Sequence, residues 1–417
     1  MSRVDVAIYA PIVGLMGNGD FFFAKKLADY FSKNNQFNAY IITNNKKLCN
    51  GDNILVEKEY DKKIKNSAIS PYLLFLGPTL SMCKSPDKIF KILKLTMIII
   101  ITEYEFSFRP YSSKYEAEAR YFKENGYNVE LWFTGLSKKQ KGIFLYSPLD
   151  QVTNLAQGFQ DQRLNHIGKL AEKVWLHYAT YDTSIDYFRA IKIELKKGGD
   201  HDVFLLGTHG EYGPITRFLF GGKKKYYLNY ATEKLKKYFK TIEYCDLDNT
   251  KNFSISGYGE GKLRLISSRK IPHADFLHII RIAQPLISVT GDQSFGEAIS
   301  FDKIMCYEPY VTHKKDFVYS YVSRLQSYLN NNYFLDANKT KKLDRDVIRK
   351  MIESSKILLS ISPKNDLSTI DFKRAYLCLL ENNGIVQDFY RHLKDNFNLY
   401  DSLNELEAKL TRTYVFK

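Results

Sequence analysis

The sequence places an acid at the end of a glycine-rich loop near its start. Gly17, Asn18, Gly19 and Asp20 separate an apolar segment, 4–9, from a segment whose apolar residues have helical spacing. Glycine lets a backbone turn tightly and approach a ligand, and a carboxylate at the mouth of a sheet can act as a general base. Asp20 is therefore a candidate catalytic residue, and a plain helix N-cap is the alternative.

A dinucleotide site is one use of such a loop, and the sequence disfavours it. NAD-binding turns have the spacing G-x-G-x-x-G and an acid that ends the second strand and holds the ribose. Here the glycines are spaced differently, and the second predicted strand, 38–43, is followed by Asn44 and Asn45. A Rossmann-type turn without a ligand is the remaining alternative at this loop.

A second glycine marks a predicted anion site at a helix start. The predicted strand 286–289 is followed by residues that would line this site, namely Thr290, Gly291, Asp292, Gln293, Ser294 and Phe295. Backbone N–H groups at 292–296 would point out of the carboxyl edge of the sheet, where a diphosphate fits. Glu297 falls one turn into the helix, where its carboxylate would reach ribose hydroxyls. The alternative is a capping box made by Ser294 and Glu297.

Three further polar residues follow or precede predicted elements of the same half. His209, beside Thr208, comes after the strand 203–206 and would contact a donor phosphate or simply face solvent. His273 begins a predicted helix and would be either a helix-start residue or a contact to the base. Glu308, directly after the strand 304–307, completes the candidate substrate-binding residues.

Other motifs indicate turns rather than sites. Asp246-Leu247-Asp248 has the D-x-D pattern of some metal-dependent transferases, but it follows a predicted strand and is interpreted as a turn. The segment 257–262 imitates a phosphate loop with a residue too few between its glycines, and is also a predicted turn. No His, Cys and Asp cluster has metal-ligand spacing, and no Gly-x-Ser-x-Gly is present.

Two parts of the chain alternate short apolar runs with amphipathic stretches, which predicts an α/β fold with parallel sheets. We expect an amino-terminal Rossmann-like domain, 1–165, and a carboxyl-terminal one, 201–340. Their predicted strands are 4–9, 38–43, 72–76, 95–101 and 129–133 in the first, and 203–206, 241–245, 262–266, 286–289 and 304–307 in the second. A helical connection, 166–200, with signals at 164–175 and 184–195, links them. A helical tail, 341–417, would pack back across both domains.

Composition bounds the class of protein. The 417 residues carry 61 Lys and Arg against 46 Asp and Glu, a formal charge of +15. No apolar run is long enough for a membrane helix, and the start lacks the order of a secretory signal, so we expect a cytoplasmic protein. Five cysteines without C-x-x-C spacing fit a reducing compartment. Basic clusters near 223–227 and 234–240 would be lysine-rich helix faces, or would contact an acidic partner such as a nucleotide, nucleic acid or lipid headgroup.

The stretch 257–316 resembles the donor half of GT-B glycosyltransferases, particularly the inverting lipid-linked N-acetylglucosamine transferases. The resemblance consists of a strand, a helix opened by Pro272-His273, and the segment from Gly291 to Glu297 that opens the next helix. The segment 309–316, with a proline, an aromatic residue and His-Lys-Lys-Asp, matches more loosely. The resemblance implies that Glu297 binds the donor ribose.

The loop that ends in Asp20 is similar to the first loop of protein-arginine rhamnosyltransferases, and 291–295 is similar to their acidic-Asp-Ser-Phe segment. Gln293 stands where that family has an acid. This resemblance implies that Asp20 is the catalytic base and Asp292 a second functional carboxylate.

Together the resemblances imply two Rossmann-like domains that face each other across a cleft, in a metal-independent, inverting glycosyltransferase without a cofactor. The donor would be a nucleotide-diphosphate sugar and the acceptor an unidentified protein, lipid or glycan, with possible peripheral membrane contact through the basic surface. Two alternatives stay open, a non-catalytic nucleotide-sugar or anionic-lipid binding protein and a basic nucleic-acid-binding protein.

Overall fold

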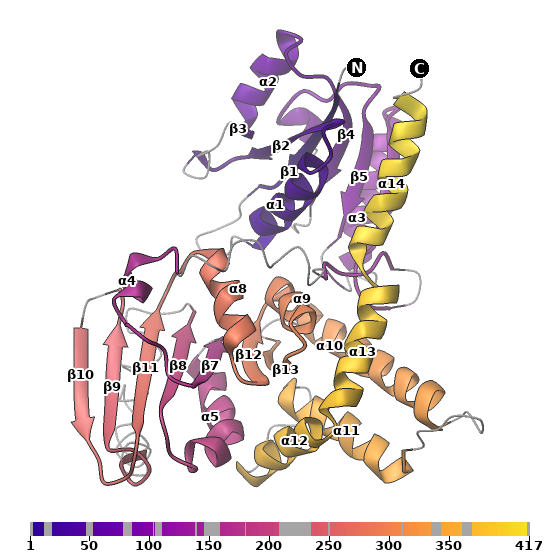
Figure 1. Cartoon of the computed structure of the whole chain (residues 1–417). Coiled ribbons are helices and arrows are strands. Elements are labelled where there is room, and N and C mark those ends of the chain that lie inside the picture. Colours follow the sequence, from indigo (N-terminus) through magenta and orange to yellow (C-terminus); the bar gives the residue numbers. More distant parts are fainter. Residues whose placement is uncertain are drawn as a thin grey trace. The chain divides into compact units, whose positions relative to one another are not determined.

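The chain forms two α/β units, each built around its own sheet. Unit 1 comprises Met1–Ile143 and Phe397–Lys417, and unit 2 comprises Phe144–Asn396 (Figure 1). The computed structural model describes residues 3–11, 19–46, 53–77, 86–102, 104, 111–137, 140–145, 159–179, 181–207, 235–248, 251–309, 312–334, 343–360 and 369–414.

The sheet of unit 1 has six parallel strands in the order β3-β2-β1-β4-β5-β6. The strands are β1 (Val4–Tyr9), β2 (Phe37–Thr43), β3 (Ile54–Val56), β4 (Pro71–Leu76), β5 (Met97–Ile101) and β6 (Asn128–Trp132). All five residues of β5 are buried, as expected for a central strand of a parallel sheet that is covered on both faces. The strand order reverses between β1 and β4, which is the doubly wound arrangement of Rossmann folds.

The helices of unit 1 come from both ends of the chain. They are α1 (Gly19–Ser32), α2 (Glu57–Lys65), the short 3-10 turn η2 (Pro86–Lys88), α3 (Tyr111–Glu124) and α14 (Leu399–Tyr414). The carboxyl-terminal α14 is fixed to α1 by side chains, because the Tyr30 hydroxyl donates to Glu407 Oε2 at 2.7 Å. Backbone hydrogen bonds between Ile143 and both Phe397 and Leu399, 2.9 and 2.8 Å long, hold its beginning.

The sheet of unit 2 has seven strands in the order β10-β9-β11-β8-β7-β12-β13. They are β7 (Lys173–Tyr178), β8 (His201–Leu206), β9 (Thr241–Asp246), β10 (Lys251–Ser256), β11 (Lys262–Ser268), β12 (Leu286–Thr290) and β13 (Ile304–Glu308). All neighbours pair in parallel except β10, which is antiparallel to β9. The chain runs outward from β7 through β8 and later returns to β12 on the other side of β7. The carboxyl ends of β7 and β12 therefore flank the switch point of this sheet.

One predicted helix is wrong, and the correction moves the domain boundary. Residues 164–175 carry helical spacing, but the helix there is only the single turn α4 (Gln162–Asn165), and β7 follows it. Val174, Trp175, Leu176 and His177 are all buried, and a strand buried on both faces gives a continuous run that periodicity cannot distinguish from a helix. Strand β7 belongs to the second sheet, and unit 2 spans Phe144–Asn396, so the predicted connection 166–200 lies within this unit.

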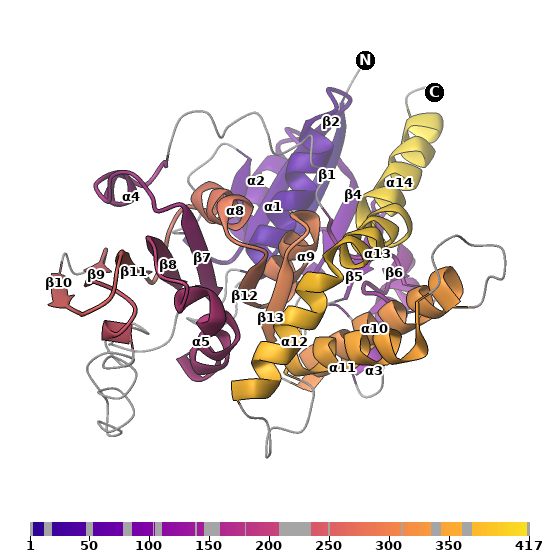
Figure 2. The ribbon, with the colours of Figure 1, turned by 60° about the horizontal axis from the view of Figure 1, so that its bottom comes forward.

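Helices complete unit 2. They are α5 (Tyr181–Leu195), α8 (His273–Ile282), α9 (Asp292–Ser300), α10 (Thr312–Leu329) with the π-helical turn η5 (Asn330–Phe334), α11 (Arg345–Leu358), α12 (Thr369–Glu381) and α13 (Asn383–Asn396). Figure 2 shows α11, α12 and α13 grouped beside α10, and α12 packs on both α11 and α5. The predicted helical tail is thus real, with α11 to α13 in unit 2 and α14 in unit 1. Most of the predicted lysine-rich helix, 225–240, lies outside the described residues.

Candidate functional site

The carboxyl end of β12 leads into a helix through a single glycine. Gly291 is the N-cap of α9 and has a φ of 84°, a conformation that other residues adopt only with strain. A Cβ atom at Gly291 would meet nothing within 4 Å, so open space lies in front of it. A glycine cap also brings no side chain to the first N–H groups of α9. A helix start of this kind can accommodate an anion, so the predicted anion site stays a prediction here.

Ser294 and Glu297 do not form a capping box. The helix begins at Asp292, and the Ser294 hydroxyl donates back to the carbonyl of Thr290 and, at 3.2 Å, to that of Gly291. Ser294 therefore anchors the turn between β12 and α9. The Thr290 hydroxyl donates to the carbonyl of Glu308 at 3.1 Å, which ties the ends of β12 and β13 together.

Glu297 is buried and forms a pair with the more exposed His273. The Glu297 side chain is 1% exposed, and its Oε1 lies 2.8 Å from Nε2 of His273, which is 32% exposed. Two residues that the sequence assigned separately to donor binding are thus one hydrogen-bonded pair between α8 and α9. Since the carboxylate is not on the surface, His273 is the member of the pair that a ligand meets first.

Asp292 forms an ion pair that the sequence did not predict. Its Oδ2 lies 2.6 Å from Nζ of Lys314, and the two side chains are 17% and 9% exposed. Lys314 lies in the first turn of α10, after β13, the neighbour of β12. The only signal in the sequence is the loosely matched segment 309–316, which gives no reason to single out this lysine.

Phe295 was predicted to contact substrate, and this prediction is wrong. The ring is fully buried, with centroids of Tyr307, Phe317 and Tyr321 at 5.0, 4.8 and 5.2 Å. It anchors α9 to β13 and α10. Gly296 serves the same packing, because a Cβ there would lie 2.5 Å from the carbonyl oxygen of Phe144. Gln293 and Glu308 are only partly buried, so they stay candidates for contact with a ligand.

Helix α8, which carries His273, is fixed at both ends. Buried Asp275 accepts the backbone N–H groups of Gln160 and Asp161 at 2.7 and 2.8 Å. At the other end the Lys303 ammonium donates to the carbonyls of Arg281, at 3.2 Å, and Ala283. Burial lowers the pKa of Lys303 to about 8.

An aromatic cluster lies beside His273 at the switch point. The ring of Phe276 is 4.8 Å from that of Tyr178, the last residue of β7, and 6.3 Å from the His273 ring. The missed strand β7 therefore supplies one side of the candidate site.

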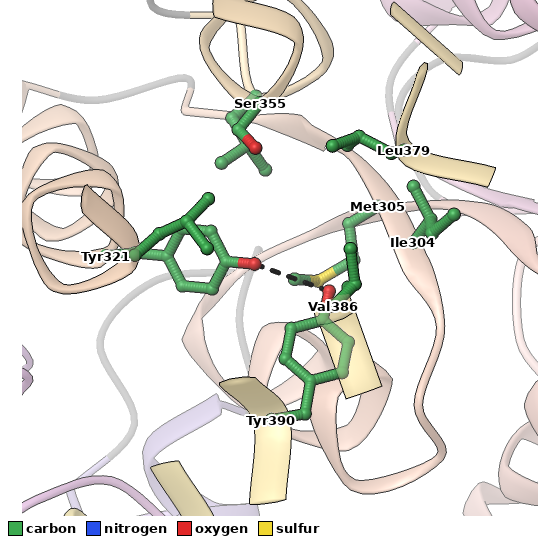
Figure 3. Close-up of a pocket in the computed structure, with 9 residues that line it drawn as sticks. Ile304, Met305, Tyr321, Ser355, Leu379, Val386 and Tyr390 are labelled. Carbon is green, nitrogen blue, oxygen red and sulfur yellow. Dashed lines mark hydrogen bonds between the residues drawn. The ribbon is translucent and has the colours of Figure 1, made fainter. Parts of the chain in front are cut away.

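The small pocket behind α9 is a packing feature rather than a site. Ile304 and Met305, at the amino end of β13, line it together with side chains from α10 to α13 (Figure 3). In it the Tyr321 hydroxyl donates to that of Tyr390 at 3.4 Å, and Tyr390 donates to the carbonyl of Lys303 at 3.0 Å. Tyr321, which lines this pocket, also packs against Phe295 of α9, so these contacts help to hold the helix in place.

The Asp246-Leu247-Asp248 segment is structural, as interpreted from the sequence. Asp248 accepts from Ser268 Oγ at 3.0 Å and from the backbone of Arg269 at 2.7 Å, and it pairs with Arg163 at 2.9 Å. Across the described parts of the chain, no group of three or more His, Cys, Asp or Glu residues is arranged to hold a metal ion.

Several predicted residues lie outside what the structure describes. Gly17, Asn18, Thr208 and His209 are in segments that are not described. Gly19 and Asp20 form the first turn of α1, and their side chains are likewise outside the description. The catalytic assignment of Asp20 therefore stays a prediction.

Comparisons with known proteins support the fold. No family model and no curated protein matches the sequence. A solved structure from Listeria monocytogenes, whose proposed activity is UDP-N-acetylglucosamine 2-epimerisation, aligns over 100% of this chain and 98% of its own, with 11% identity and a TM-score of 0.51. The glycotransferase of kitacinnamycin (98% and 100% covered, 9% identity, TM-score 0.47) and an alpha-glucosyltransferase with UDP and DNA (92% and 100%, 12%, 0.35) align less well.

The fold is therefore of the GT-B type, with two parallel Rossmann-like sheets and carboxyl-terminal helices. Among the described helices, none combines the length and the apolar character that crossing a membrane requires.

Proposed function

We propose that the protein is a glycosyltransferase that uses a nucleotide-diphosphate sugar, without a metal ion and with inversion at the sugar carbon. The observation that supports this most is the start of α9. It lies at the switch point of the second sheet, is opened by a glycine at φ 84°, and has a buried carboxylate one turn inside. Parallel sheets bind ligands at this place, and the dipole of a helix start favours a phosphate group.

The donor would occupy the carboxyl edge of the second sheet. Its diphosphate would accept hydrogen bonds from backbone N–H groups at 292–294, beside Thr290 and Gln293. The ribose would be held by the pair of His273 and Glu297, with the carboxylate acting directly after the imidazole moves or through the imidazole itself. The aromatic cluster beside His273 gives an apolar wall for the base.

The acceptor would be activated by Asp20, which opens α1 in unit 1. The acceptor lone pair forms the new bond to the sugar C1, and the C1–O bond breaks with its electron pair on the diphosphate. The acceptor proton passes to the Asp20 carboxylate. Asp292 would be the second functional carboxylate, on the donor side.

The name of the Listeria protein refers to a UDP-sugar, and its fold is similar to that of this chain. This similarity supports a nucleotide sugar as the ligand. That name also defines a competing product. An epimerase would interconvert free or nucleotide-bound sugars with no acceptor present, whereas a transferase releases nucleoside diphosphate only as an acceptor becomes glycosylated.

A thermal-shift panel of UDP-, GDP-, dTDP- and CMP-sugars tests the proposal. A ligand at about 100 times its Kd stabilises the native state by about 2.7 kcal/mol, which is a rise of roughly 3–5 °C in Tm. We expect this rise for one nucleotide class and its free diphosphate, but not for the nucleoside. No shift with any donor would reject the proposal, and salt-sensitive binding of oligonucleotides instead would favour the nucleic-acid alternative.

Turnover separates the remaining alternatives. The donor that shifts Tm is incubated with cell extract as a source of acceptors, and both nucleoside diphosphate and sugar products are measured. Acceptor-dependent release supports transfer. Binding without release would indicate the non-catalytic alternative, and sugar interconversion without acceptor would indicate an epimerase.

A further inference from the structure

Two loops meet at the carboxyl edge of the second sheet. The strands β12 and β13 are parallel neighbours, and their last residues, Thr290 and Glu308, are register partners joined by a 3.1 Å hydrogen bond. The helices that follow, α9 and α10, therefore begin close together. Their first turns are joined by the ion pair between Asp292 and Lys314, with a 2.6 Å contact and both side chains mostly buried.

This ion pair resolves a conflict in the proposed donor site. The start of α9 would hold a diphosphate, but the same turn carries the carboxylate of Asp292. Two anions placed together repel, and the repulsion grows where water is excluded. The helix dipole offers only about half a positive charge in compensation. A buried ammonium 2.6 Å from Asp292 supplies a full charge at this point.

We propose that Lys314 binds the diphosphate of the donor, and that it shares its charge between Asp292 and the diphosphate when donor is present. This inference rests on the proposed function. An ammonium group has three N–H donors, so it can donate to a carboxylate and to phosphate oxygens at once. When the C1–O bond breaks, the electron pair stays on the diphosphate. A fixed cation stabilises that developing charge, which is the part a divalent metal plays in other transferases.

Inorganic pyrophosphate is the probe that isolates this role, because it carries neither base nor sugar. Calorimetric titrations of the full chain would compare Lys314→Met with Lys315→Met, an exposed lysine next to it on α10. We expect Lys314→Met to weaken binding of pyrophosphate and of the nucleoside diphosphate by about 10- to 100-fold. Lys315→Met should bind like the parent, and nucleoside affinity should not change in either variant.

The variant Asp292→Asn should change pyrophosphate affinity in the opposite direction. Removing the carboxylate frees Lys314 for the diphosphate, so pyrophosphate affinity should rise several-fold. Loss of the repulsion between Asp292 and the diphosphate acts in the same direction, so an affinity that does not rise would overturn the inference, and the double variant isolates the part that belongs to Lys314.

Because Lys314→Met leaves a buried carboxylate without its cation, a loss of folding would imitate a loss of binding. The double variant Asp292→Asn, Lys314→Met removes both charges and avoids this problem. It should bind pyrophosphate about 10- to 100-fold more weakly than Asp292→Asn alone. Equal binding by the two would overturn the role of Lys314 while the proposed function still stands, provided that the parent binds a nucleoside diphosphate. Failure of the parent to bind any nucleoside diphosphate would overturn both.

Discussion

Both sheets carry acidic residues at the carboxyl ends of their parallel strands, but the partners of these acids differ. In unit 2 two acids are paired with basic side chains, Asp292 with Lys314 and Glu297 with His273. In unit 1 the hydroxyl of Tyr9, the last residue of β1, donates to Glu57 at 3.0 Å, and a second acid, Glu118, lies nearby on α3.

Glu118 shows that acids at the edge of the first sheet lack, within the described part of the chain, the basic partners found in unit 2. Burial, and then the charge of Asp87, raises the pKa of Glu118 to about 8. Among the residues that the structure describes, neither Glu118 nor Glu57 has a cationic partner. An edge whose Asp292 is paired with a lysine suits an anionic donor, whereas an edge with a buried acid that holds a proton suits an acceptor that must lose one. This contrast supports the proposed division of donor and acceptor between the units.

The largest effect should come from Asp20→Asn, which tests the acceptor half. Asn matches Asp in size but is a far poorer base, so sugar transfer should fall by ~10²–10⁴-fold while Tm changes little and nucleotide affinity stays unchanged. The measurement is acceptor-dependent release of nucleoside diphosphate. Asp29→Asn, an exposed acid on the same helix, is the control and should transfer at the parent rate. Parent activity in Asp20→Asn would reject the catalytic assignment and leave this residue as an acid in the first turn of α1, where its charge stabilises the helix start.

Glu297→Ala tests the donor half. Removing a charged hydrogen-bonding group should weaken nucleoside diphosphate binding by about 10- to 100-fold, measured by calorimetry. The exposed acid Glu353, changed to Ala, is the control. Affinity for the 2′,3′-dideoxy nucleotide should fall much less, since it lacks the hydroxyls that the pair would hold. An equal loss for both nucleotides would place Glu297 in the fold rather than in the ribose site.

Two glycines of α9 should separate stability from binding. Gly296→Ala forces a Cβ to within 2.5 Å of the Phe144 carbonyl, so unfolding free energy should fall by about 1–3 kcal/mol. Gly291→Ala faces open space, so its loss of about 1–3 kcal/mol would come from the backbone conformation alone, and unlike Gly296→Ala it should weaken nucleotide binding. Urea unfolding and calorimetry measure the two effects. Gly384→Ala on α13, where a Cβ meets nothing within 4 Å, should not destabilise.

The smallest effect concerns pH and the uncompensated acid of unit 1. Because the folded-state pKa of Glu118 is raised from 4.5 to about 8, its contribution to stability is fully present below pH 4.5 and is lost as pH rises through 8. Glu118→Gln should remove this dependence, so the variant should gain of order 1 kcal/mol on the parent between pH 5 and 9, given partial solvent screening. Urea unfolding at both pH values measures it. Exposed Glu116→Gln should show no such trend, and a flat difference for Glu118→Gln would contradict the raised pKa.

The sequence predicts the outline of the fold well and the site in part. Apolar runs such as 4–9 and 203–206 are short and bounded, so they predict strands correctly. The strand β7 was not predicted because its residues are buried on both faces and its sequence lacks an apolar period of two. The antiparallel edge strand β10 escapes because it has little apolar character, and β3 because it is three residues long.

The candidate site shows the same division. Gly291, Asp292 and Glu297 are close in sequence and could be placed on one helix start from their spacing. The partners that decide their chemistry, Lys314 and His273, come from other helices and depend on strand order. Phe295 was misassigned because an aromatic residue beside a predicted site has the same appearance in sequence whether it faces a ligand or the core.

Hydrogen exchange of the peptide that spans 286–300 tests the central claim most directly. The claim is that a nucleoside diphosphate binds at the start of α9, where backbone N–H groups would donate to it. At saturating nucleoside diphosphate, the amides of residues 292–294 should exchange more slowly, while the nucleoside alone leaves them unchanged. Slower exchange elsewhere in the chain with none in this peptide, at a nucleotide concentration that raises Tm, would contradict the account.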